Sequence, residues 1–181
     1  MKFVKKWLGC IVSAVAGILG LALSACPGMF TKNLTFKTTE STKAFKVLTD
    51  GDLYKMAKDA KVGSEFMLMK VFAIITLVIS VLLIAYAVVM LLSNLNVIKL
   101  NNKILDMAGI ALIALLLIAV IGPFISSLSY ASAMTDALKE LAAFIGKVKV
   151  SIGAYQPVML AVGIVSAVAV GANVYLNKKA K

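Results

Sequence analysis

The chain has 181 residues, of which 61% are hydrophobic and only 15% are charged. Soluble domains are about 45–50% apolar and about 25% charged, so this composition excludes an ordinary soluble enzyme and a disordered binding tail. The net charge of +11 comes from 19 lysines against 8 acidic residues. Such a composition predicts an integral membrane protein.

Four apolar segments reach the roughly 20 residues that a helix needs to cross a bilayer. They are residues 7–26, 71–92, 107–130 and 157–176. None shows the period-2 alternation that is typical of membrane β-barrel strands. We therefore predict an all-α membrane protein, a single four-transmembrane-helix bundle over residues 1–181. Its outer loops, at about residues 27–66 and 131–156, are expected to form a small extracytoplasmic cap.

The first apolar segment begins after the basic stretch MKFVKK and ends in Leu23-Ser24-Ala25-Cys26. This pattern resembles a bacterial lipoprotein signal, and the resemblance implies lipidation of Cys26 and removal of the residues before it. The uncharged run of the segment is longer than the 7–15 residues of an ordinary signal-peptide core. We therefore favour a retained first span, with processing at Cys26 as the alternative.

Lysines cluster at both ends of the chain, at Lys2, Lys5, Lys6, Lys178, Lys179 and Lys181. Basic clusters next to spans favour the cytoplasmic side, and an even number of spans places both termini together. We predict cytoplasmic termini in the plasma membrane of a prokaryote. Lysines at membrane borders also favour contact with anionic lipid headgroups over binding of nucleic acid.

The first outer loop contains weak signals for short elements. Alternation of Leu34 and Phe36 predicts a strand over residues 33–38. Helical spacing predicts a short helix over residues 40–48, and Asp52 is the expected N-cap of a second helix over residues 53–61.

A stripe of apolar residues from Leu128 to Ile145 extends the third helix beyond the membrane as far as Gly146. Gly122 and Pro123 lie inside this helix and predict a kink, because proline removes a backbone donor and crowds the preceding turn. Residues 147–152 alternate again and predict a short strand, for which residues 34–36 are the expected partner.

Small residues recur at four-residue steps in the first and fourth spans, which lets helix backbones approach closely. The stripe residues are Gly9, Ser13, Gly17 and Gly20 in the first span, and Gly163, Ala167 and Gly171 in the fourth. Packing of these two helices within one chain is the simpler interpretation. The alternative is an interface between subunits.

Polar residues within the spans are few. Ser126, Ser127 and Ser129 gather near the outer end of the third span, where they either bond to helix carbonyls or line a pore. Histidine and arginine are absent, and no motif for catalysis, a cofactor or a metal is found. We expect neither enzyme activity nor a small-molecule substrate.

These observations favour a structural or accessory membrane subunit that acts through helix and loop contacts. Its expected partners are other copies of the chain or other membrane subunits. The first alternative is an oligomeric, holin-like pore, which the serines support. The second is a lipid-anchored envelope protein processed at Cys26.

Overall fold

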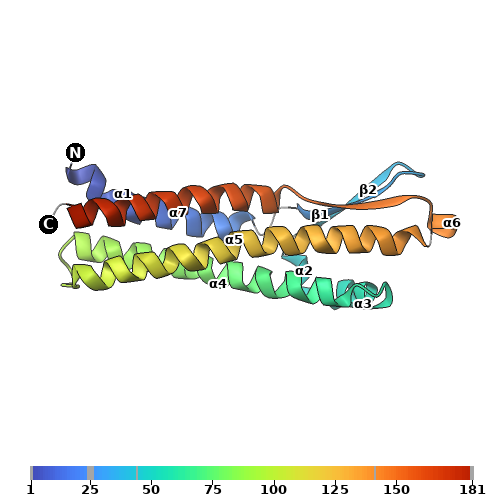
Figure 1. Ribbon diagram of the computed structural model, residues 1–181, viewed down its shortest axis with the longest axis horizontal. Coiled ribbons are helices and arrows are strands. Elements are labelled where there is room, and N and C mark those ends of the chain that lie inside the picture. The colour runs from blue at the N-terminus through green and yellow to red at the C-terminus, as the bar shows by residue number, and fades with distance from the viewer. Residues whose placement is uncertain (1, 24–26, 44, 141, 180–181) are drawn as a thin grey trace.

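The computed structural model describes residues 2–23, 27–43, 45–140 and 142–179. In these residues, four long helices lie side by side (Figure 1): α1 (Lys2–Leu23), α4 (Gly63–Asn94), α5 (Asn102–Lys139) and α7 (Tyr155–Lys179). Helix α1 packs on α4 and α7, and α5 packs on the same two helices. The four helices therefore form a bundle in which each contacts two neighbours. Both ends of the chain lie at the same end of this bundle.

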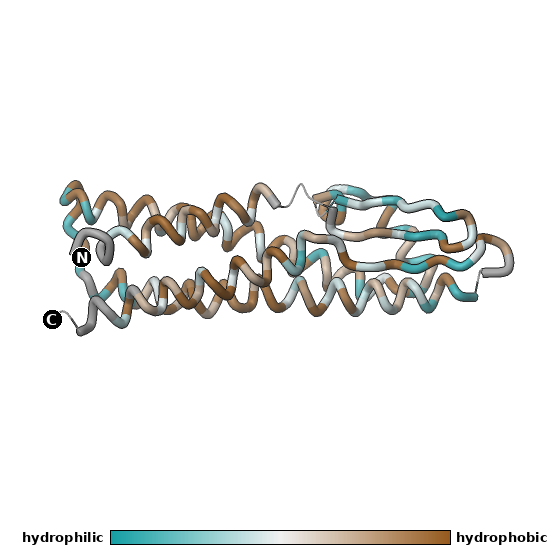
Figure 2. The backbone as a smooth tube through the Cα atoms, turned by 90° about the horizontal axis from the view of Figure 1, so that it is seen from above, coloured by the Kyte–Doolittle hydropathy of each residue, from teal (hydrophilic) through white to brown (hydrophobic). Residues whose placement is uncertain are grey.

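Three of the described helices are long and apolar enough to cross a membrane. They cover Gly63–Asn94, Lys103–Lys139 and Tyr155–Ala172, and α1 adds a shorter apolar stretch, Trp7–Ala22. Figure 2 shows hydrophobic residues along the length of the bundle, whereas hydrophilic residues gather in the strands at one end. The prediction of a mainly helical integral membrane protein agrees with this distribution.

The end of the molecule opposite the termini carries most of the short elements (Figure 1). A three-stranded antiparallel sheet in the described residues has the order β2-β1-β3. Its strands are β1 (Pro27–Asn33), β2 (Thr38–Lys43) and β3 (Val148–Ile152), and the short helices are α2 (Lys46–Thr49), α3 (Gly51–Asp59) and α6 (Ala142–Ile145). We call these six elements the cap. The N-terminal part of α4 and the C-terminal part of α5 extend from the bundle to meet it.

The strand predicted over residues 33–38 is wrong, because the chain turns there. Strand β1 ends at Asn33, whose side-chain oxygen accepts bonds from the amides of Thr35 (3.0 Å) and Phe36 (3.1 Å). Lys37 closes the turn with a φ of 54°. Asparagine favours this type of turn, because its side chain can bond to the backbone two residues further on. The local turn chemistry therefore overrides the weak alternation of Leu34 and Phe36.

The helix predicted over residues 40–48 is wrong for its first half, which belongs to a strand. Residues 38–43 read TTESTK and form β2, and only Lys46–Thr49 is helical. Threonine is β-branched and suits a strand that pairs with a neighbour on one side. The second short helix exists, but it begins at Gly51. Its N-cap is Asp50 instead of the expected Asp52.

The strand predicted at residues 147–152 is present as β3, but its partner differs from the prediction. Met29–Asn33 of β1 pairs with β3, so residues 34–36 are not its partner strand. The bond from the Leu34 amide to the Lys147 carbonyl (2.6 Å) marks the point where this pairing ends.

Helix α5 extends well beyond the predicted span, but it ends at Lys139 instead of reaching Gly146, and a separate short helix, α6, covers Ala142–Ile145. Gly146 follows with a φ of 77°, a conformation that glycine adopts without steric cost. The helix is continuous through Gly122 and Pro123. The kink expected there stays a prediction.

Candidate functional site

The centre of the bundle is closely packed. A cavity of about 10 Å³ lies between the helices, lined by residues that include Ala16, Thr76 and Val120. A water molecule needs about 10–15 Å³ of this kind of space, so the cavity holds one water at most. The Thr76 hydroxyl lies 2.8 Å from the carbonyl of Ala119 on α5, and the Ser80 hydroxyl donates to the Thr76 carbonyl (2.8 Å). These hydroxyls thus bond to helix backbone.

The three candidate pore serines do not lie together on one face. Ser126 and Ser127 are 1% and 2% exposed, whereas Ser129 is exposed on the outside of α5. The Ser126 hydroxyl donates to the Pro123 carbonyl (3.2 Å), and Ser127 accepts a bond from the side-chain amide of Gln156 (3.2 Å). The side-chain oxygen of Gln156 is buried without a partner in the described structure. Sequence reasoning missed Gln156, because it lies just outside the predicted fourth span.

The small residues of α1 contact α4 more closely than the predicted partner, α7. A Cβ atom at Gly17 would lie 2.7 Å from the Ser80 carbonyl oxygen and 2.6 Å from the Ile84 side chain. One at Gly20 would meet the Ser80 hydroxyl. Gly9 and Ser13 are also buried on α1. The glycines of α1 therefore allow α4 to approach.

In α7, the atoms nearest to a Cβ at Gly163 belong to Val120, so this glycine faces α5. Helices α1 and α7 are nevertheless neighbours, and Ala167 of α7 belongs to the same buried cluster as Ala16 of α1. Gly171 lies in an open place, since a Cβ there would meet only the Ile113 side chain at 3.7 Å. Cys26, the candidate for lipidation, lies outside the described residues.

An apolar groove of about 370 Å³ runs between α1 and α7 on the outside of the bundle. Its rim is exposed, with Ile11 at 58% and Val165 at 67%. The groove is lined by Ile11, Val12, Val15, Leu19, Ala161, Val162, Val165 and Ser166. The Ser166 hydroxyl donates to the Val162 carbonyl (2.7 Å), so this one polar group is satisfied within α7.

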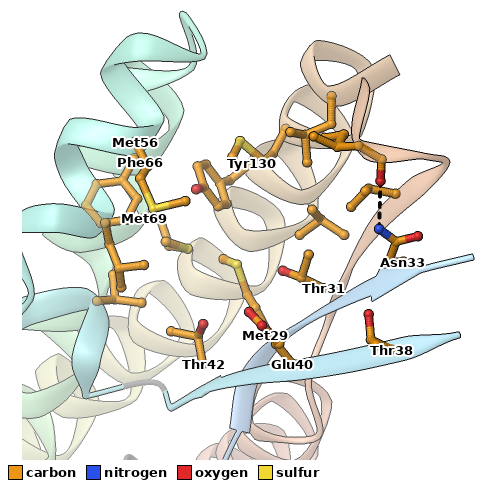
Figure 3. A pocket seen from close by; sticks show the side chains of 17 residues that line it. Met29, Thr31, Asn33, Thr38, Glu40, Thr42, Met56, Phe66, Met69 and Tyr130 are labelled. Carbon is orange, nitrogen blue, oxygen red and sulfur yellow. Dashed lines mark hydrogen bonds between the residues drawn. The ribbon is translucent and has the colours of Figure 1, made fainter. Parts of the chain in front are cut away.

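A much larger pocket, of about 570 Å³, lies in the cap (Figure 3). One wall is formed by large apolar side chains of α3, α4 and α5. Phe66 and Met69 are almost fully buried, and Tyr130 packs edge-on against Phe66 with ring centroids 5.6 Å apart. Further members of this wall are Leu53, Met56, Met134 and Leu138.

The opposite wall of the pocket is one face of the sheet. Strand pairing places Thr31 beside Glu40 of β2 on one side and Val150 of β3 on the other. Because side chains alternate along a strand, the rows two residues above and below share this face. Those rows are Asn33, Thr38 and Val148, and Met29, Thr42 and Ile152. The sheet wall therefore changes from apolar at β3 to polar at β2, as Figure 3 shows for Thr38, Glu40 and Thr42.

Comparison with known proteins places the bundle in a family. The model of the sodium:solute symporter family matches residues 11–138, which is more than half of the chain. The chain belongs to the sodium:solute symporter family. The match begins at Ile11 in α1, includes the hairpin of β1 and β2 and all of α4, and ends one residue before the end of α5. Elements α6, β3 and α7 lie after the matched region. No curated protein and no solved structure matches the chain.

Membership of the sodium:solute symporter family agrees with an integral membrane protein. Most of the cap pocket lies inside the matched region, since β1, β2, α3, α4 and α5 supply its walls except at β3 and Ile145. Among the described residues of this family member, no group of three acidic, cysteine or histidine side chains is placed to hold a metal ion.

Proposed function

We propose that this member of the sodium:solute symporter family is a four-span accessory or structural subunit that acts through contacts within the membrane. In this proposal the shorter apolar stretch of α1 crosses the membrane as well as α4, α5 and α7. The lysine clusters at both termini favour the cytoplasmic side of the membrane. The cap, at the opposite end of the bundle, then lies on the outer side.

The closed interior of the bundle carries this proposal. A conducting path needs polar groups or a water-filled space across the bilayer. Here the cavity at the centre measures about 10 Å³, and Thr76, Ser80 and Ser166 bond to carbonyl oxygens of the helices. This close packing of the described residues favours a role through contacts over a pore in the monomer.

The groove between α1 and α7 is the surface that we assign to self-association. It is long and apolar, and small side chains such as Ala161 leave room for a helix of a second copy. We expect Val165→Cys, in a variant with Cys10 and Cys26 replaced by alanine, to form disulfide-linked dimers in vesicles. The matched control is Ile118→Cys, which is also exposed but lies on α5.

Oxidative cross-linking followed by gel electrophoresis measures this difference. Dimers from Val165→Cys at several times the yield of Ile118→Cys would support the assigned interface. Equal yields from both variants, falling together as the lipid-to-protein ratio rises, would indicate random encounters and contradict it.

A second candidate function follows from the family match. A sodium:solute symporter segment acts in transport, and this chain would then supply part of a transporter. We expect vesicles that contain the purified chain alone to show no sodium uptake above protein-free vesicles, because its interior is closed. Radioactive sodium uptake, driven by an inward gradient, checks this expectation.

Two variants make the uptake measurement specific. Sodium uptake that is abolished by Ser127→Phe, at the buried serine, but not by Ser129→Phe, at the exposed one, would contradict the contact role and support conduction through the bundle. Uptake that is absent in all three proteins supports the accessory role.

A further inference from the structure

The cap pocket plays no part in the proposed function, and a role for it is independent of that function. Its volume of about 570 Å³ falls within the range of about 300–1,000 Å³ that is usual for small-molecule sites. Met29, Phe66, Met69 and Tyr130 in its walls are each less than 10% exposed, so the pocket is formed by ordered core residues.

The span limits predicted from the sequence place the pocket at the border of the membrane. Phe66 and Met69 come just before the span predicted to begin at residue 71, and Tyr130 is the last residue of the span predicted to end there. Aromatic residues are enriched at this level of a bilayer. Molecules that concentrate in the interfacial region of the bilayer are therefore at the same depth as the pocket.

The two walls differ in polarity, and this difference favours a ligand with one apolar part and one polar part. The helix wall offers aromatic and methionine side chains, which adapt to flexible hydrocarbon groups. The wall at β2 offers the hydroxyls of Thr38 and Thr42 and the carboxylate of Glu40. A hydrocarbon chain fits against the first wall while a polar head group lies against the second.

The charge of the head group follows from Glu40. Glu40 is the one charged side chain among the described residues that line the pocket. The ion pairs of the described residues join Lys55 to Asp52 and Lys139 to Asp136, so Glu40 has no lysine partner. A carboxylate without a partner beside threonine hydroxyls favours a cation with N–H donors and disfavours an anion.

We propose that the cap pocket binds a single-chain amphiphile with a primary ammonium head, its hydrocarbon chain against Phe66, Met69 and Tyr130 and its head at Glu40. The ligand enters from the membrane interface and needs no movement of the closed bundle.

The test uses the full chain, labelled with ¹³C at the methionine methyl groups, in nanodiscs of phosphatidylcholine. Dodecylamine, dodecanol and dodecanoate are the probes, because they share a chain and differ in head-group charge. We expect dodecylamine to produce saturable shifts of Met29, Met69 and Met134, which line the pocket. Signals of Met90 and Met159, which are buried in the bundle, should not move.

The variant Glu40→Gln isolates the head-group contact. We expect its half-saturating dodecylamine fraction to rise about three- to five-fold, the size of effect typical of an exposed charge pair, while dodecanol binding stays unchanged. Asp59→Asn removes a charge from an exposed position of α3 outside the pocket and should change neither. Matching spectra of the free proteins would establish that both variants are folded.

Three results would overturn the proposal. Shifts that appear at all methionines and do not saturate would mean that the probes only partition into the lipid. Equal affinity for dodecylamine and dodecanol, unaffected by Glu40→Gln, would remove the ammonium contact. Tighter binding of dodecanoate would reverse the assigned charge of the head group.

Discussion

Replacing Gly17 by alanine should destabilise the bundle by about 1–3 kcal/mol, the usual cost of forcing an extra methyl group into a packed core. The new Cβ would lie 2.7 Å from the carbonyl oxygen of Ser80, which belongs to the backbone of α4 and cannot rotate away. Helices α1 and α4 must therefore separate. The free energy of unfolding, measured by steric trapping in bicelles, checks the prediction.

Gly171→Ala is the matched control for Gly17→Ala. Both positions lie in long helices, but a Cβ at Gly171 would meet one side-chain atom, of Ile113, at 3.7 Å. Because alanine is the better helix former by about 1 kcal/mol, this variant should be neutral or slightly more stable. Equal destabilisation by the two substitutions would mean that the close α1–α4 contact is not the cause.

Replacing Asn33 by alanine should loosen the hairpin at the far end of the cap. Its side-chain amide donates to the Ile145 carbonyl (2.8 Å), and its oxygen accepts from the amides of Thr35 and Phe36. Each such bond contributes about 1 kcal/mol, so the loss of all three should favour local opening by about 1–3 kcal/mol. We expect hydrogen exchange of the Thr35 and Phe36 amides to accelerate about ten-fold or more.

The variant Asn33→Asp separates the two roles of this side chain. Aspartate keeps an acceptor for the amides of Thr35 and Phe36 but loses the donor to Ile145. Exchange at the turn should therefore stay close to that of the wild type, while the tie to α6 is lost. If alanine and aspartate accelerate exchange at Thr35 and Phe36 equally, the acceptor bonds do not hold the turn.

The long helices were predictable because apolar runs of about 20 residues have few alternatives in a membrane protein. The stripe from Leu128 to Ile145 also predicted that α5 leaves the bundle, and its residues Met134 and Leu138 now line the cap pocket. In the first case the length of the apolar run decides the structure, and in the second the helical period does.

The hairpin was harder to predict, because two weak local signals compete there. Alternation around Leu34 and Phe36 favoured a strand, whereas the side chain of Asn33 stabilises a turn at the same residues. The helices that the glycines pack against were equally hard to predict. Gly163 contacts Val120 on α5, and nothing in the spacing of small residues distinguishes that neighbour from α1.

The cap pocket could not be predicted from any single segment. Its walls come from stretches as distant as Met29, Phe66 and Val150, and the sheet face forms only after β1 pairs with both β2 and β3. Glu40 appeared in the sequence as one acidic residue of a helix. Its place beside Thr31 on the pocket wall follows from strand register alone.

Helix α5 joins the two halves of the molecule as one continuous element of 38 residues, about 57 Å long. It contributes Ala119 and Val120 to the bundle core and Tyr130 to the cap pocket. The hydrocarbon core of a bilayer is about 30 Å thick, and helices tilt to match it. We therefore expect a change in bilayer thickness that tilts α5 to move Tyr130 with it, so that the cap pocket responds to the lipid composition around the bundle.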